Sequence, residues 1–376
     1  MRSLTIAIAL LLSCSPLPVT LPSPSATTSS TATPTATASA SLTPTRALVG
    51  TLSASRPFIR PDDPKGFGIP IMSDGRFAAA ALNDGHGTYR LVAVDLSSGS
   101  IRTVPVPDGA YGGIVGLDSG RLAISAWRPG PGDLRTYDYQ LEDLATSTRR
   151  TLDHFEVPGR FHSQGAAPAP DPLFIFSHSA VAYNHLYTQG DQLYAELRLG
   201  PIDGPMRVAV TTTAVVAPVA LSDTALVYWI AVGAEYVVHL YDLASARDRV
   251  LLRAPAGTVE VALSNDRLLY STHMNSPTAQ TGRLVIRDLA TDSETTLTTG
   301  NCTYPTLNER YAVAGCADAG RAPMTVTAYD LATLQSVEVA RSLEPLAGPR
   351  AAPGVIYWIR YAGAPPITPY FELLRY

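Results

Sequence analysis

The sequence predicts an all-β protein made of repeated units of four antiparallel strands. Apolar runs that follow a turn residue recur along the chain, and from Arg46 onward no window has apolar residues at helical spacing. Equivalent residues of these runs are 45, 59, 45, 42, 43 and 44 residues apart, at Phe77, Leu122, Val181, Leu226, Leu268, Tyr311 and Val355. Seven units of about 44 residues are typical of a seven-bladed β-propeller with four-stranded antiparallel blades.

The first 13 residues predict a lipoprotein signal peptide, which takes no part in the fold. Arg2 supplies a positive charge, and the apolar run from Leu4 to Leu12 is too short to span a bilayer as a helix. The run ends in Leu11-Leu12-Ser13-Cys14, which resembles a bacterial lipobox, in which the cysteine is acylated. The alternative is an ordinary secretion signal with an incidental cysteine. Lipidation of Cys14 would anchor the protein to a membrane without spanning it.

Residues 14–46 predict a disordered stalk. The tract from Ser15 to Arg46 is rich in Pro, Ser, Thr and Ala and has almost no charge, so it cannot bury a core. In a polyproline-like form, ~30 residues at ~3.1 Å each reach on the order of 100 Å. We therefore expect an exported protein, lipid-anchored to the cell membrane, whose folded domain is held outside the cytoplasm.

Residues 47–376 are predicted to form the propeller domain. A unit of aspartate, leucine and a small residue ends the third strand of most blades, where the aspartate is expected to cap a turn and the leucine to pack inward. It occurs at Asp95-Leu96, Asp143-Leu144, Asp242-Leu243, Asp288-Leu289 and Asp330-Leu331. The long spacing is assigned to an insertion from Asp153 to Asp171. The last blade lacks one strand, so Ala47 to Ser53 is expected to complete it and close the ring.

Two cysteines remain in the predicted domain, Cys302 and Cys316. An exported chain can form disulfides, and the two strands around the turn at Asn308-Glu309 would place these cysteines opposite each other. A disulfide is therefore predicted, with free buried thiols as the alternative. A metal site is disfavoured because no histidine or further cysteine has suitable spacing.

The aspartate–leucine repeats, most clearly Tyr241-Asp242-Leu243-Ala244 and Tyr329-Asp330-Leu331-Ala332-Thr333, resemble those of TolB-like and WD-repeat-like β-propellers of bacterial envelopes. The resemblance covers roughly residues 47–376, although the Gly-His and Trp-Asp marks of the WD repeat are missing. It implies a rigid disc that binds proteins or envelope components. It brings no catalytic residues to this chain.

No sequence motif points to catalysis. Gly116-Leu117-Asp118-Ser119-Gly120 has its serine one place too late for a nucleophile elbow and lies in a predicted hairpin turn. Candidate acids lack a recognisable pairing, at Asp84, Asp133, Glu156, Asp171, Glu235 and Asp318. A metal site from His86, His154, His162 and His273 would require their loops to converge, so we predict neither metal nor cofactor. The net charge of −4 gives no reason to expect a nucleic-acid partner.

The predicted binding face carries the loops between second and third strands and the connections between blades, because these lie on one side of a four-stranded blade. Loops held by a rigid scaffold often bind ligands, and exposed aromatic and arginine side chains are common anchors. The candidates are Trp127, Arg128, Arg160, Phe161, His162, His273 and Arg321. The alternative for Trp127 and Phe161 is that they fold over neighbouring blades. Asp242, Arg287 and Asp288 are expected to be structural.

The sequence therefore favours a membrane-anchored, non-catalytic propeller that binds an envelope protein or glycan outside the cytoplasm. The alternative is an envelope enzyme, a glycan lyase or hydrolase with its site at the mouth of the central channel. A third reading is a structural spacer. Convergent acids at the channel would favour the enzyme, and an aromatic–arginine patch would favour binding.

Overall fold

The computed structural model divides the chain into two units, Met1–Ser41 and Leu42–Tyr376. It describes residues 51–56, 67–83, 89–106, 110–158, 173–272, 282–317, 324–342, 346–362 and 368–376, all within the second unit. Cys14 and the predicted stalk lie outside these residues. Among the described residues, the chain forms no helix that could cross a membrane.

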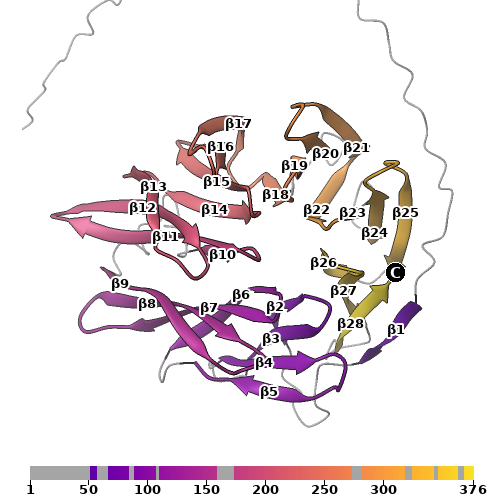
Figure 1. Ribbon diagram of the computed structural model, residues 1–376, viewed down its shortest axis with the longest axis horizontal. Helices are drawn as coiled ribbons and strands as arrows, with labels where there is room; N and C mark the ends of the chain where they lie inside the picture. The colour runs from indigo at the N-terminus through magenta and orange to yellow at the C-terminus, as the bar shows by residue number, and fades with distance from the viewer. Residues whose placement is uncertain are drawn as a thin grey trace, which may run out of the picture. The chain divides into compact units, whose positions relative to one another are not determined.

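The second unit is built from seven four-stranded antiparallel sheets, which confirms the predicted seven-bladed propeller (Figure 1). Sheets one to four contain β2 (Phe67–Ser73), β3 (Phe77–Asn83), β4 (Tyr89–Asp95), β5 (Ile101–Val104); β6 (Tyr111–Asp118), β7 (Arg121–Pro129), β8 (Leu134–Asp143), β9 (Arg149–Pro158); β10 (Phe174–Phe176), β11 (Ala180–Gln189), β12 (Gln192–Pro201), β13 (Arg207–Thr212); and β14 (Val216–Leu221), β15 (Ala225–Val232), β16 (Glu235–Asp242), β17 (Asp248–Pro255). Sheets five and six contain β18 (Val259–Leu263), β19 (Arg267–Thr272), β20 (Arg283–Asp288), β21 (Glu294–Thr299); and β22 (Asn301–Leu307), β23 (Tyr311–Ala317), β24 (Met324–Asp330), β25 (Ser336–Ser342).

The seventh sheet combines strands from both ends of the unit. It has the order β1-β28-β27-β26, with β26 (Leu346–Ala352), β27 (Val355–Ala362), β28 (Thr368–Arg375) and β1 (Thr51–Arg56). β1 is antiparallel to β28, with Leu52 opposite Leu374. The paired strand overlaps the predicted Ala47–Ser53 at Thr51–Ser53, while residues 47–50 lie outside the described residues; closure of the ring by this strand stays a prediction.

The core consists of apolar clusters between neighbouring blades. The second strands are almost inaccessible, as in β3, where Ala78, Ala79 and Ala80 are fully buried. They are sandwiched between two blades, and this explains why they read as continuous apolar runs in the sequence. One cluster joins β3 of the first blade to Val355 and Tyr357 of the seventh, so blades from the two ends of the unit pack together.

The aspartate–leucine unit ties two turns of a blade together. The carboxylate of Asp143 accepts hydrogen bonds from the backbone N–H groups of Ala145 (2.9 Å) and Thr146 (2.8 Å), which confirms the predicted cap. The next residue, Leu144, is buried and donates its backbone N–H to the carbonyl oxygen of Gly120 in the first turn of the blade (2.8 Å). The third blade lacks the aspartate, but the N–H of Ile202 makes the equivalent bond (2.8 Å).

Two predictions of loops are wrong because strands extend further than expected. β9 runs to Pro158, so the first part of the predicted insertion, Asp153 to Pro158, is strand; residues 159–172 lie outside the described residues. β7 runs to Pro129 and β8 begins at Leu134. Trp127 and Arg128 are therefore strand residues and not loop residues. Periodicity alone could not place these strand ends, since both segments contain polar residues.

Candidate functional site: the central channel

A channel of about 1250 Å³ is lined by the first strand of the blades. These strands form one edge of each sheet and lie toward the middle of the ring in Figure 1. The wall is largely apolar, with Met72, Val115, Ile175, Phe176, Val219, Leu221 and Val261 among its residues. Phe176 of β10 lies so close to Gly116 of β6 that a Cβ atom at position 116 would be 2.4 Å from its ring.

The opening at the turns between first and second strands carries polar groups that hold neighbouring blades together. Asp74, for example, accepts a hydrogen bond from the backbone N–H of Gly120 in the next blade (2.6 Å). The bonds between neighbouring blades join Asp74 to Gly120, Ser119 to His178, Asp223 to Ser177 and Ser179, Asn265 to Asp223, Arg267 to Leu331, Asn308 to Ala352 and Arg375 to Gly75. We call this set of bonds the turn belt. Its charged residues have structural partners.

One contact in the turn belt has the residue types of a hydrolytic site. Ser119 has a left-handed backbone (φ 51°), and its Oγ lies 3.1 Å from Nδ1 of His178. A serine nucleophile needs a histidine that is itself oriented by a third group. Asp223 is the nearby carboxylate, but it accepts hydrogen bonds from Ser177 and Ser179, and it forms no ion pair with His178 among the described residues. The arrangement is explained by turn and blade contacts.

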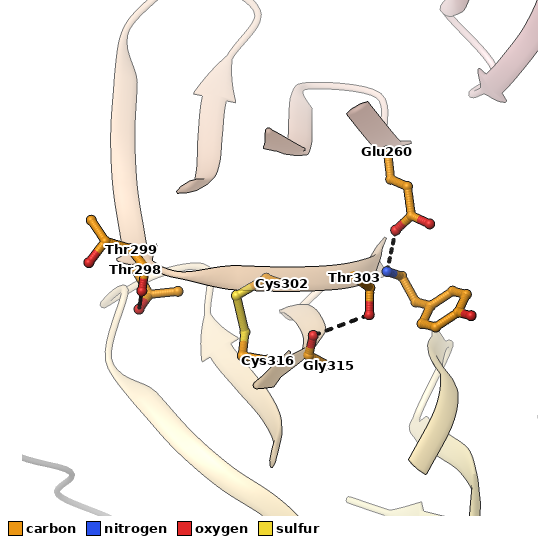
Figure 2. Close-up of a disulfide and its surroundings, with 8 residues drawn as sticks. Glu260, Thr298, Thr299, Cys302, Thr303, Gly315 and Cys316 are labelled. Atoms are coloured by element: carbon orange, nitrogen blue, oxygen red, sulfur yellow. Dashed lines mark hydrogen bonds between the residues drawn. A yellow bond between two sulfur atoms is a disulfide. The ribbon is translucent and has the colours of Figure 1, made fainter. Parts of the chain in front are cut away.

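Inside the channel, Tyr304 has a backbone conformation that is unusual for an aromatic residue. It lies in β22 with φ 55°, where the register of β22 against β23 shifts between Thr303 and Thr306. A left-handed L-residue costs about 1–2 kcal/mol. The strand is joined to β23 two residues earlier by the disulfide between Cys302 and Cys316 (Figure 2). The Tyr304 side chain is 38% exposed, so its ring is accessible from the channel.

Glu260 of β18 accepts a hydrogen bond from the Tyr304 backbone. The N–H of Tyr304 donates to Oε2 of Glu260, which points toward β22 in Figure 2. Burial raises the pKa of the Glu260 carboxyl above its ordinary value, and the hydrogen bond from Tyr304 and the charge of Arg350 partly offset this rise. A carboxyl that burial pushes toward its neutral form in a channel wall is a feature of binding and catalytic sites.

Arg350 of β26 completes the cluster. Its guanidinium carbon lies 5.7 Å from the centre of the Tyr304 ring, which is a cation–π distance. Its Nη1 donates a long hydrogen bond to the carbonyl oxygen of the adjacent Pro349 (3.4 Å). Among the described residues Arg350 forms no ion pair, whereas Arg360 in the same blade pairs with Glu372. We call Glu260, Tyr304 and Arg350 the channel cluster.

An aromatic pair lines the same cavity on the side of the fourth blade. The rings of Trp229 in β15 and Tyr236 in β16 are stacked, with centres 4.0 Å apart and planes 10° from parallel. Both side chains are partly exposed, and both line the channel together with Val259 of the next blade. The channel therefore offers an aromatic surface, an apolar wall and one group of charged side chains.

Comparison with solved structures finds propellers in proteins of different function. One similar structure is that of a prolyl endopeptidase, with a TM-score of 0.59 and 13% sequence identity; the match covers 81% of this chain and 47% of the endopeptidase chain. The acylaminoacyl peptidase of Pyrococcus horikoshii has a TM-score of 0.57 and 10% identity over 82% of this chain and 52% of that one. TolB from Acinetobacter baumannii has a TM-score of 0.43 and 12% identity over 80% of each chain.

The shared feature is the propeller fold. This chain spans about half the length of the two peptidases. No family model and no curated protein matches it. TolB and other propellers occur among the similar structures, while the fold itself is established by the seven sheets.

Only part of the predicted binding face can be assessed. Arg160, Phe161, His162, His273 and Arg321 lie outside the described residues. Trp127 packs against the largest apolar cluster, which spans the second to fourth blades, and the guanidinium of Arg135 in its own blade lies 4.9 Å from its ring; its role in binding stays a prediction. Arg128 is a half-buried residue of β7, opposite Thr136.

The remaining candidates are also separated or structural. His154 is part of β9, and its Nδ1 lies 2.7 Å from Oδ1 of Asp138, so its predicted place in an inserted loop is wrong. His86, Asp84, Asp171 and Asp318 are outside the described residues. Glu156 lies in β9 and Glu235 begins β16. Within the described part of the chain, no three His, Cys, Asp or Glu residues are placed to hold a metal.

The channel cluster was not predicted from the sequence. Its residues are 44 and 46 residues apart, about one repeat, so equivalent strands of successive blades bring them together. One local signal was present in Tyr304-Pro305. A proline inside an inner strand indicates a bulge, and bulges often redirect a side chain at a functional site.

Proposed function

We propose that the protein is an exported β-propeller, lipid-anchored to the cell membrane through Cys14, that binds an envelope protein or glycan through its central channel without catalysis. The observation that carries this proposal is the channel itself, which combines an apolar wall with the charged channel cluster. Binding pockets typically have mainly apolar linings with a few placed polar groups. The anchor and the location outside the cytoplasm are supported by the leader and stalk sequences.

Capture from envelope extract tests the proposal. Full-length protein in detergent would be immobilised and exposed to extract from its own organism, before and after treatment with protease or glycosidases. We expect a retained component that is lost with Arg350→Gln and kept with Trp127→Ala, because Trp127 packs against an apolar cluster and does not line the channel. The treatment that abolishes capture identifies a protein or a glycan. No retention by the native protein would contradict the binding function.

The channel cluster also favours a second function, the glycan lyase. In elimination from an acidic sugar, a guanidinium such as that of Arg350 would neutralise the substrate carboxylate, and a nearby tyrosine hydroxyl such as that of Tyr304 would move a proton. Native protein and Tyr304→Phe would be incubated with acidic polysaccharides while the absorbance of unsaturated products is recorded. Product formed by the native protein and lost in the variant would favour the enzyme over the binding scaffold.

A further inference from the structure

We infer that the channel holds an extended peptide and that Arg350 binds its C-terminal carboxylate. The inference rests on the proposed binding function and specifies its partner as a peptide with a free C-terminus. It depends on three features of the described residues: the charge state of the channel cluster, the sheet edges in the channel wall, and the aromatic pair.

The first feature is a guanidinium that forms no ion pair among the described residues. A guanidinium stays protonated in proteins, and its planar fork matches a carboxylate with two hydrogen bonds. Arg350 is half-buried in the channel and has no ion pair among the described residues. Glu260 is the carboxyl of the cluster and lies close enough for the charge of Arg350 to lower its pKa, but it forms no ion pair with Arg350 and accepts the N–H of Tyr304. An incoming carboxylate would supply the hydrogen-bonded partner for the guanidinium that the described residues do not.

The second feature is the backbone that faces the channel. Each first strand is the edge of its sheet, and an edge presents N–H and C=O groups to any strand placed beside it. Two of these edge donors already take side-chain acceptors from a neighbouring first strand: Tyr304 donates to Glu260, and the N–H of Ala351 donates to Oγ1 of Thr306 (3.2 Å). These two bonds show that edge groups of the first strands take partners in the channel. An extended peptide can pair with other groups of the same edges, whereas a fatty acid, which also carries a carboxylate, cannot pair along a strand.

The third feature is a place for side chains. Trp229 and Tyr236 present stacked rings to the cavity, next to Val259 and Val261 of the following blade. Glu260 lies between these two valines in β18, so the apolar surface and the channel cluster lie on opposite faces of that one strand, both along the channel. A peptide anchored at Arg350 would place an apolar or aromatic side chain against this surface. Sugars would leave much of the apolar wall without a partner.

The experiment uses two pools of random octapeptides, one with free C-terminal carboxylates and one amidated. Full-length protein in detergent is immobilised, and retained peptides are identified by mass spectrometry. We expect retention from the free-acid pool, enriched in apolar residues near the C-terminus, and affinity at least tenfold lower for the amidated form of a retained peptide. Arg350→Gln should weaken binding by about ten- to a hundredfold, and Arg350→Lys should restore it only in part, because the fork is lost.

Arg253→Gln is the matched control. Arg253 is exposed on β17, the outermost strand of the fourth blade, so its loss should leave binding unchanged. Equal melting temperatures would show that both variants fold. Equal retention from the two pools, or equal binding of dodecanoate, would overturn the assignment of a C-terminal carboxylate on a peptide while leaving the binding function in place. Retention from neither pool would overturn it as well, and envelope capture then decides the function separately.

Discussion

Reduction of the disulfide between Cys302 and Cys316 should destabilise the propeller by an amount that the structure allows us to estimate. The cysteines face each other across β22 and β23, with Cα atoms 4.1 Å apart, and the bond closes a loop with a sequence separation of 14 residues. Loss of a cross-link around a loop of this size costs about 3 kcal/mol in the chain-entropy description. Cys302 is also buried, in the cluster between the fifth and sixth blades.

The expected change in melting temperature follows from the size of the domain. Unfolding entropy is about 2.1 cal/mol/K per residue, which for a domain of roughly 330 residues gives about 0.7 kcal/mol/K. A loss of about 3 kcal/mol in one cooperative transition therefore lowers the melting temperature by about 4 °C.

The assay is calorimetry of the native protein with and without a phosphine reductant, together with Cys302→Ala/Cys316→Ala as control. The double variant should melt near the reduced native protein and should not respond to reductant. Thiol labelling of unreduced protein purified from its own organism should find neither cysteine free. Two free thiols, or a difference below about 1 °C between oxidised and reduced native protein, would refute the reasoning.

Four further changes test other parts of the argument. Glu260→Gln should be tolerated or stabilising at neutral pH. The pKa of Glu260 is raised in the folded state, so its carboxyl contributes stability below the ordinary pKa of 4.5 and that contribution is lost as pH rises. Chemical unfolding of the native protein, relative to the variant, should therefore become easier from acid to neutral pH. Tyr304→Gly should leave the free energy of unfolding in urea unchanged or raise it by about 1 kcal/mol, because relief of the left-handed strain exceeds the entropic cost of glycine. A clearly lower free energy of unfolding would contradict the strain. Deletion of β1 (Thr51–Arg56) exposes the edge of β28 and should lower the melting temperature and speed proteolysis, whereas an unchanged melt would show that the ring does not need this strand. Cys14→Ser should abolish labelling by a fatty-acid analogue and move the protein from the membrane pellet to the supernatant, and an unlabelled native protein would contradict lipidation.

The blades could be predicted from the sequence because each repeats the same local physics. A second strand sandwiched between two blades must be apolar on both faces, and this produces the continuous runs at Leu122 and Val181. The turn after the third strand needs a side-chain acceptor, which Asp143 and Asp242 provide. These requirements act within one repeat, so seven copies of the signal reinforce one another.

Strand ends and the channel cluster could not be predicted in the same way. Trp127 reads as a loop residue because a polar and proline-rich segment follows it, yet pairing with Tyr137 of β8 and packing against an apolar cluster keep it in β7. Glu260, Tyr304 and Arg350 lie in three different blades, and each is ordinary in its own repeat. They meet only because the ring places successive first strands around one channel.

The contrast between the turn belt and the channel cluster is the strongest physical reason to place function in the channel. In the turn belt, charged and polar side chains such as Asp74 and Asp223 satisfy backbone and hydroxyl groups of the next blade, so their contribution to stability explains them. In the channel cluster, a tyrosine adopts a strained backbone, a carboxyl has its pKa raised by burial, and a guanidinium has no ion pair among the described residues. The first two of these features cost stability by themselves. Departures from local rules that converge on one accessible cavity are expected where a site is shaped for a ligand, because binding can offset costs that folding alone does not.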